Sequence, residues 1–219
     1  MVLRPDRQLG GFPLDASTGA ATAAMRTALE SLRSRLELVL DDKLGPVAAE
    51  QRAFLEVARR DGARLTSLLD DVELIAGADA GEVDLDWAPC DLAEVAGHAA
   101  ETAWPRAIAG GKEIEVHVDG PTLVMADVRR LTGAVTRLLQ LAVDAASPGS
   151  AIEIAVSRAA IELHYEADAL PTDRTLTVAV ADTVAKLHGG AVTAALGDNS
   201  VSISLATAPP LLELASTAP

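Results

Sequence analysis

Apolar residues recur with a helical period through the first third of the chain. Over residues 17–42 they fall within one stripe at about 100° per residue, which predicts an amphipathic helix. A second stripe predicts another helix over residues 49–76, and Leu44-Gly45-Pro46 between the two is a strong stop signal. The stripes consist of Met25, Leu29, Leu32, Leu36, Val39 and Leu40, followed by Phe54, Val57, Ala58, Leu65, Leu68, Leu69, Val72 and Ile75.

Two long helices joined by a short turn form an antiparallel hairpin, which covers only half of each apolar stripe. Pairing two hairpins into a four-helix bundle buries the remainder, so the pattern predicts a homodimer. Asp61 lies near the middle of the second stripe. It marks either a polar site on the bundle or a position exposed where the bundle splays.

After Gly77-Ala78-Asp79-Ala80-Gly81, which has the composition of a linker, the pattern becomes mixed. Short alternating runs predict strands, and longer amphipathic runs predict helices, so we expect an α+β sandwich with a mixed sheet covered on one face. The expected strands are 82–85, 113–118, 152–156, 161–165, 191–195 and 201–206, and the expected helices are 91–109 with Asp91 as cap, 127–146 and 175–188.

These elements divide the chain into four parts. Residues 1–16 and 207–219 show no sustained period and are expected to be a flexible arm and a flexible tail. The hairpin is assigned to residues 17–77 and the sandwich to residues 82–206.

Composition limits the function. The 219 residues are 49% hydrophobic and only 2% aromatic, so a globular core must come from Leu, Val, Ile and Ala. A net charge of −14 argues against binding to nucleic acid or to an anionic membrane surface. No run resembles a signal peptide or a membrane span, and the single Cys90 cannot form an internal disulfide. We expect a soluble, cytoplasmic protein in which Cys90 is a small, half-buried structural side chain rather than a reactive thiol.

Several segments, in order and at matching intervals, resemble the dimerisation and ATP-binding core of a sensor histidine kinase. The resemblance covers residues 24–206 and implies a hairpin that dimerises into a four-helix bundle, followed by a GHKL-type sandwich. The segments are Leu29 to Arg35, Glu50 to Val57, Asp70-Asp71-Val72, Ala78 to Gly81, Pro89 to Val95, Ala126 to Leu131, Ala145 to Gly149 and Lys186 to Gly190.

The segment that should hold the family's phosphoaccepting histidine departs from the pattern. The resemblance places Glu30 at the histidine position, and only Leu32 and Arg33 of the motif are retained. Ser34 replaces a threonine and Arg35 a proline. A carboxylate has no nucleophilic nitrogen that could form a phosphoramidate, so the substitution removes the first chemical step of the family.

The segments that would handle ATP depart as well. Arg137 and Leu141 stand where the family has asparagines that hold magnesium, and leucine offers no oxygen ligand. The loop from Glu166 to Pro171 lacks the glycines of the adenine-binding motif, although Asp168 could imitate its aspartate. Residues 166–174 are too few for the ATP lid, and Thr175-Leu176-Thr177-Val178 replaces the phosphate-binding Gly-x-Gly. We therefore expect a degenerate sandwich that binds neither ATP nor another cofactor.

One face of the first helix is the candidate partner-binding site. Glu30 points away from the apolar stripe, and this face is either simply solvated or a docking surface, because the family's receiver-domain partners bind around the histidine position. The candidate residues are Glu30, Arg33, Ser34, Glu37 and Asp41.

The four histidines suggest no metal site. His98, His117 and His164 are dispersed and are expected to have structural or surface roles. His188 matches the family's His-Gly-Gly helix end, where a cation or a hydrogen-bond donor is favoured. No nucleophile–base motif is present.

Two functions fit the sequence. The first is a pseudokinase adaptor or regulator that acts by protein–protein binding in two-component-type signalling, with a response regulator receiver domain or a related histidine kinase as partner. The alternative is a phosphorelay protein similar to bacterial histidine phosphotransferases that do not bind ATP, which would still require a histidine in the bundle. A degenerate pocket near Leu141 and Val178 that takes an apolar ligand is a third possibility without specific support.

Overall fold

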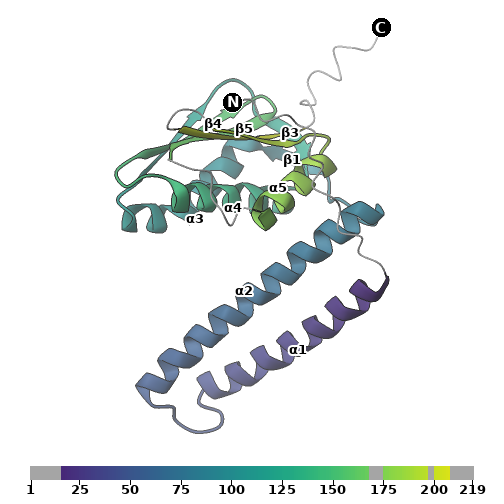
Figure 1. Cartoon of the computed structure of the whole chain (residues 1–219), viewed down its shortest axis with the longest axis vertical. Coiled ribbons are helices and arrows are strands. Elements are labelled where there is room, and N and C mark those ends of the chain that lie inside the picture. The colour runs from purple at the N-terminus through teal and green to yellow at the C-terminus, as the bar shows by residue number, and fades with distance from the viewer. Residues whose placement is uncertain (1–15, 168–174, 197–199, 208–219) are drawn as a thin grey trace. The chain divides into compact units, whose positions relative to one another are not determined.

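A helical hairpin and a separate α+β unit make up the chain. The computed structural model describes residues 16–167, 175–196 and 200–207, and the chain divides into one unit up to Val83 and another from Asp84 onward (Figure 1). The first unit consists of α1 (Ala16–Leu40) and α2 (Ala49–Ala80), which pack against each other. The predicted arm, tail and adenine loop, with Asp168, lie almost entirely outside the described residues.

The turn between the two helices is held by polar contacts. Asp42 adopts a left-handed conformation with φ 56°, which permits the reversal of the chain after α1. Arg52, in the first turns of α2, donates at 2.6 Å to the carbonyl oxygen of Leu40 and at 2.6 Å to Oδ1 of Asp42. The stop signal in the sequence therefore produces a turn that ties the end of α1 to the start of α2.

The second helix continues through the segment that the sequence analysis assigned to a linker. Gly77 to Ala80 are helical, and the helix ends only at Gly81, which is left-handed with φ 70°. The N–H of Gly81 bonds to the carbonyl of Ala78 and that of Glu82 to the carbonyl of Gly77, which is the Schellman arrangement. The linker prediction was wrong because Gly77 does not end the helix: a single glycine inside a helix costs only about 1 kcal/mol. The helix ends at Gly81, where the backbone takes the positive φ that favours glycine.

In the second unit, three helices lie on one side of a five-stranded mixed sheet (Figure 1). The strand order is β2-β4-β5-β7-β6, with β2 parallel to β4 and the remaining pairs antiparallel. The elements are α3 (Leu92–Ala109), β2 (Glu113–Val118), α4 (Val128–Ala145), β4 (Ala151–Ser157), β5 (Ala160–Glu166), α5 (Thr175–Leu187), β6 (Val192–Leu196) and β7 (Ser200–Ala206). This arrangement agrees with the predicted α+β sandwich.

The core lies between the sheet and the helices, and the strand pattern determines its position. Ile152, Ile154 and Val156 of β4 are buried, while the residues between them face away from the core. On α3, the buried face is mostly alanine, which lets the helix approach the sheet closely. Small and branched side chains thus fill the core of a protein with few aromatic residues.

A small second sheet was not predicted. β1 (Ala88–Asp91) pairs antiparallel with β3 (Leu123–Ala126), whereas the strand expected over residues 82–85 is absent and residues 82–87 have no regular structure. The alternation of Glu82 to Leu85 resembles a strand, but no partner strand lies beside it. Strands as short as β1 and β3 form because the tertiary fold brings them together, and local sequence contains little information about that.

Asp127 caps α4 and connects it to the segment before β1. Its Oδ1 accepts a hydrogen bond from the N–H of Arg130 at 3.0 Å, and its Oδ2 accepts one from the N–H of Asp86 at 3.3 Å. Burial alone would raise the pKa of this carboxyl, but these hydrogen bonds and the neighbouring charges of Arg130 and Arg129 lower it. The buried cap therefore stays ionised at neutral pH.

His188, directly after α5, is a buried connection rather than a surface group. Its Nδ1 lies 2.7 Å from the carbonyl oxygen of Val184, and the N–H of Asp127 donates to its Nε2 at 2.9 Å. Because Nε2 accepts, Nδ1 carries the proton and the ring is neutral. The sequence analysis expected a cation or a donor at this helix end, and the structure shows the donor. The rings of Trp87 and His188 make a T-shaped contact with their centroids 5.3 Å apart.

We predict that His188→Ala destabilises the second unit. The substitution leaves a cavity and removes the acceptor for the buried N–H of Asp127, so the free energy of unfolding should fall by about 2–4 kcal/mol. Urea unfolding followed by tryptophan fluorescence tests this, since Trp87 and Trp104 both lie in this unit. His98→Ala, at an exposed helix position, is the control and should change stability by less than about 0.5 kcal/mol. Equal effects of the two substitutions would contradict the assignment.

Candidate functional site

The predicted partner-binding residues lie on the exposed surface of α1, except for Asp41, which is the first residue of the turn after it. Glu30, Arg33, Ser34, Glu37 and Asp41 are all exposed. Within this group, Nε of Arg33 lies 3.3 Å from Oε1 of Glu37, one helical turn apart. Asp41 instead lies 3.3 Å from Nζ of Lys43. Such pairs at exposed positions are weak, so a partner could displace them at little cost.

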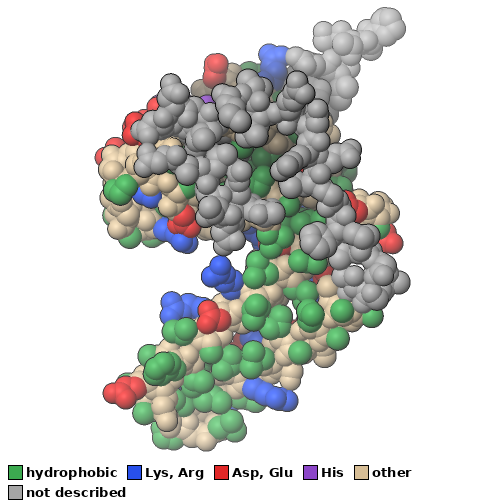
Figure 2. Space-filling model, viewed as in Figure 1, with side chains coloured by type: hydrophobic (Ala, Val, Ile, Leu, Met, Phe, Trp, Pro, Cys, Tyr) green, Lys and Arg blue, Asp and Glu red, His purple; other side chains and the backbone are tan. Residues whose placement is uncertain are grey.

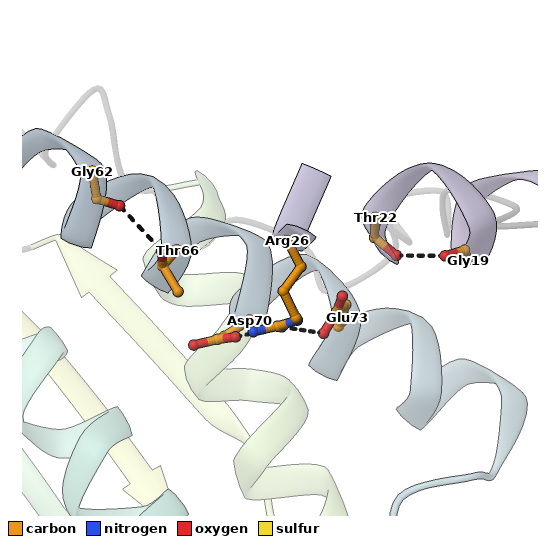
Figure 3. A network of polar contacts seen from close by, with 7 residues as sticks. All are labelled: Gly19, Thr22, Arg26, Gly62, Thr66, Asp70 and Glu73. Atoms are coloured by element: carbon orange, nitrogen blue, oxygen red, sulfur yellow. Dashed lines mark hydrogen bonds and ion pairs between the residues drawn. The ribbon is translucent and has the colours of Figure 1, made fainter. Parts of the chain in front are cut away.

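One turn before Glu30, Arg26 joins the two helices of the hairpin. Its guanidinium reaches across from α1 and lies between two carboxylates of α2, 2.6 Å from Oδ1 of Asp70 and 2.5 Å from Oε2 of Glu73 (Figure 3). Hydrogen bonds to Asp70 and Glu73 raise the pKa of Arg26, which is ionised in any case. The bridge fixes the position of α1 along α2, and with it the position of Glu30. The sequence analysis missed this bridge because Asp70 and Glu73 lie 44 and 47 residues after Arg26 in the sequence.

The hairpin leaves much of its apolar surface uncovered. Hydrophobic side chains extend along it in Figure 2, and Phe54 is 79% exposed, Met25 57% and Leu65 50%. A groove of about 420 Å³ runs between the two helices. Its lining is Met25, Ala28, Leu29, Leu65, Leu68, Leu69 and Val72. Exposed apolar surface of this kind marks an interaction site, because monomeric proteins rarely leave large apolar patches in water.

The positions that the sequence resemblance assigns to the nucleotide site carry mainly apolar side chains. Leu141 lies half-buried on α4, beside the buried Leu138 and Ala142. α4 packs against α5, whose first turn contains the half-buried Leu176, Thr177 and Val178. The start of α5, where the sequence resemblance places a phosphate-binding turn, therefore carries side chains instead of glycines.

The segment that would contain the lid is short. β5 ends at Glu166 and α5 begins at Thr175, so only residues 167–174 connect them. Residues 168–174, which include most of the predicted adenine loop, lie outside the described residues.

Cys90 is more deeply buried than expected. It lies in β1 with 2% of its surface exposed, and burial together with the charges of Asp91 and Glu94 raises its pKa to about 11. A protonated, inaccessible thiol is unreactive, in agreement with the expected structural role.

The histidines are not brought together, but one of them joins two carboxylates. Among the residues that the structure describes, a single group of three potential metal ligands converges: Glu115, His117 and Glu153, all exposed. The sequence analysis missed this group because Glu153 belongs to a different strand, and only the sheet register shows which residues it faces.

In the described part of the chain, no helix combines the length and apolar character needed to cross a bilayer.

Solved structures with a similar arrangement include several histidine kinases. Full-length ShkA in complex with AMPPNP gives a TM-score of 0.69 at 22% identity, over 87% of this chain and 46% of that chain. Histidine kinase AdeS from Acinetobacter baumannii gives 0.59 at 18% identity, over 84% of this chain and 98% of that chain. The cytoplasmic segment of histidine kinase QseC gives 0.55 at 16% identity, over 67% and 94%.

These similarities establish the fold. The chain has the architecture of a histidine kinase core with a GHKL-type domain, as the sequence resemblance predicted. It spans less than half the length of full-length ShkA. No protein-family model matches the sequence, and no curated protein matches it either.

We predict that the Arg26 bridge contributes to hairpin stability through its charge. Arg26→Gln should lower the melting temperature of the hairpin, and the difference should shrink as sodium chloride screens the ion pairs. Thermal unfolding followed by far-ultraviolet circular dichroism at low and high salt measures both effects. Arg33→Gln is the matched control, because its partner Glu37 lies on the same helix. If Arg26→Gln lowers the melting temperature no more than Arg33→Gln does, or by an amount that does not depend on salt, Arg26 does not hold the helices together through its charge.

Proposed function

We propose that this chain is a catalytically inactive, histidine-kinase-like regulator that acts by binding another signalling protein. The observation that carries the proposal is the exposed carboxylate of Glu30 on α1, at the position where the resemblance places the phosphoaccepting histidine. A carboxylate at this position can form ion pairs and hydrogen bonds with a partner but cannot form a phosphoramidate. Binding remains possible where phosphorylation of a histidine does not.

The rest of the hairpin offers no replacement for the missing acceptor. His98 is the first histidine in the sequence, so neither α1 nor α2 contains one. The four histidines lie in or beside α3, β2, β5 and α5 of the second unit. This distribution supports a hairpin whose role is association rather than phosphate transfer.

The nucleotide-site positions support the same proposal. Magnesium requires oxygen ligands, and Leu141 supplies only carbon. Side chains on Leu176 and Val178 occupy the helix start, where phosphate would otherwise approach backbone N–H groups. Loss of the metal ligand and of the phosphate-binding turn together removes the electrostatic contacts on which ATP affinity in this fold depends.

The active form is proposed to be a homodimer. A second hairpin seated on the groove between α1 and α2 would bury the exposed Met25, Leu65 and Leu68 and complete a four-helix bundle. The apolar surface that a single chain leaves in water supports this arrangement, because each Å² of apolar surface buried in the dimer stabilises it by about 25 cal/mol. Mixed dimers with a related histidine kinase would use the same surface.

The charge of the candidate face indicates the chemistry of its partner. Glu30, Glu37 and Asp41 contribute three carboxylates, against the single cation of Arg33. A receiver domain is the proposed partner, and its own acidic pocket would repel this face. The contact should therefore use basic groups that border the pocket. This arrangement allows the regulator to bind a receiver domain without taking part in phosphate chemistry.

The alternative function, a phosphotransferase that does not bind ATP, is favoured by one observation. The connection between β5 and α5 is restricted to residues 167–174, as expected for proteins of that class. Such a protein still needs a histidine on the hairpin, and the sequence has none there. The inactive regulator is therefore the better proposal.

We predict that Glu30→Lys weakens binding to the cognate receiver domain by about tenfold or more, since like charges across an interface are strongly unfavourable. Biolayer interferometry of the full-length chain against a panel of purified receiver domains measures the affinity. Glu50→Lys makes the same change of charge at an exposed position on α2 and should leave the affinity within about twofold. A bound receiver domain that is insensitive to Glu30→Lys would refute the assignment of this face.

A further inference from the structure

The face of the sheet that points away from the helices carries a convergent set of metal-ligating side chains. Glu115 and His117 are two residues apart on β2, so their side chains point to the same side. Glu153 of β4 lies directly opposite Glu115 in the parallel register. All three are exposed, and one donor atom from each lies within 4.8 Å of the others. Nε2 of His117 is 3.4 Å from Oε2 of Glu115.

This side of the sheet has an excess of negative charge. The strands β2, β4 and β5 contain five glutamates, two histidines and neither lysine nor arginine. Like charges directly opposite each other on neighbouring strands are destabilising, as in the pair of Glu115 and Glu153. A bound cation would replace this repulsion with attraction.

The imidazole decides which cation fits. Carboxylates alone would suit magnesium or calcium, whereas a set of one nitrogen and two oxygen donors suits zinc and its neighbours in the transition series. Bond lengths of about 2.0–2.2 Å require the donors to move closer together. Exposed glutamate side chains can do so by changing rotamer, because no packing holds them in place.

We propose that Glu115, His117 and Glu153 form a binding site for a divalent transition-metal ion of the zinc type. Nε2 of His117 and one carboxylate oxygen of each glutamate are the ligands, and water completes the coordination. The ion cross-links β2 to β4. Since β2 is an edge strand that pairs only with β4, the cross-link stabilises this edge of the sheet. The site is independent of the proposed function, because it lies in the second unit and uses none of the residues on the hairpin.

Calorimetric titration of the full-length chain, without a histidine tag, with zinc chloride tests the proposal. We expect one ion per chain with micromolar affinity, and His117→Gln should weaken binding by at least about tenfold. The matched control is His164→Gln on the same face of the sheet. His164 lies directly opposite the ligand Glu153 in the register of β4 and β5, and its Nε2 is 3.2 Å from Oε2 of Glu162, but it is not part of the convergent group, which makes it a stringent control. This control should stay within about twofold of the unmodified chain.

A second readout separates a specific site from general attraction to an acidic surface. Zinc should raise the melting temperature of the unmodified chain and of His164→Gln, but not that of His117→Gln, because the aligned ligands exist only in the folded sheet. Magnesium at the same concentration should have no effect. The proposal is overturned by absence of saturable zinc binding, by equal losses in the two histidine variants, or by competition from equimolar magnesium.

Discussion

The apolar layer between the sheet and its three helices is the interaction on which the second unit depends. Its members alternate along the strands, as Ile152 and Ile154 do on β4, and they recur at helical spacing on α3 and α4. Once these positions are buried, the intervening residues must face solvent. The packing of the core therefore determines where Glu153 and the other outer-face residues lie, although these residues are not part of the core. The same holds for side chains on the flanks of the helices.

This separation allows side chains on the flanks of the helices to vary while the architecture persists. On α4, the fully buried Leu138, Leu139 and Ala142 form the contact with the core, whereas Arg137 and Leu141 are only half-buried beside them. Substitutions at the flanking positions alter what the surface can bind without opening a cavity in the core. In the hairpin, the Arg26 bridge and the apolar stripes likewise hold α1 against α2. The exposed position 30 contributes nothing to this contact, so its residue can change without disturbing the hairpin.

Sequence reasoning succeeded where one element contains its own signal. The long helices follow from apolar periodicity, and the cap of α3 follows from Asp91, whose Oδ1 accepts from the N–H of Ala93 at 2.9 Å. It failed where the signal depends on distant partners. The pairing of β1 with β3, the bridge from Arg26 to α2 and the convergence of Glu153 with His117 require the tertiary fold. The end of α2 was also misjudged, because the flanking glycine-containing segment resembles a linker although it remains helical.

We propose that, in this chain, the fold of a histidine kinase core serves association with a partner and not phosphate transfer. Catalytic inactivity is the central claim of this proposal, and it requires that the chain does not bind ATP. Calorimetric titration of the full-length chain with ATP and magnesium at millimolar concentrations, beside an active histidine kinase as positive control, tests it most directly. The account predicts a saturable signal for the control and none for this chain. Saturable, magnesium-dependent binding by this chain would contradict it.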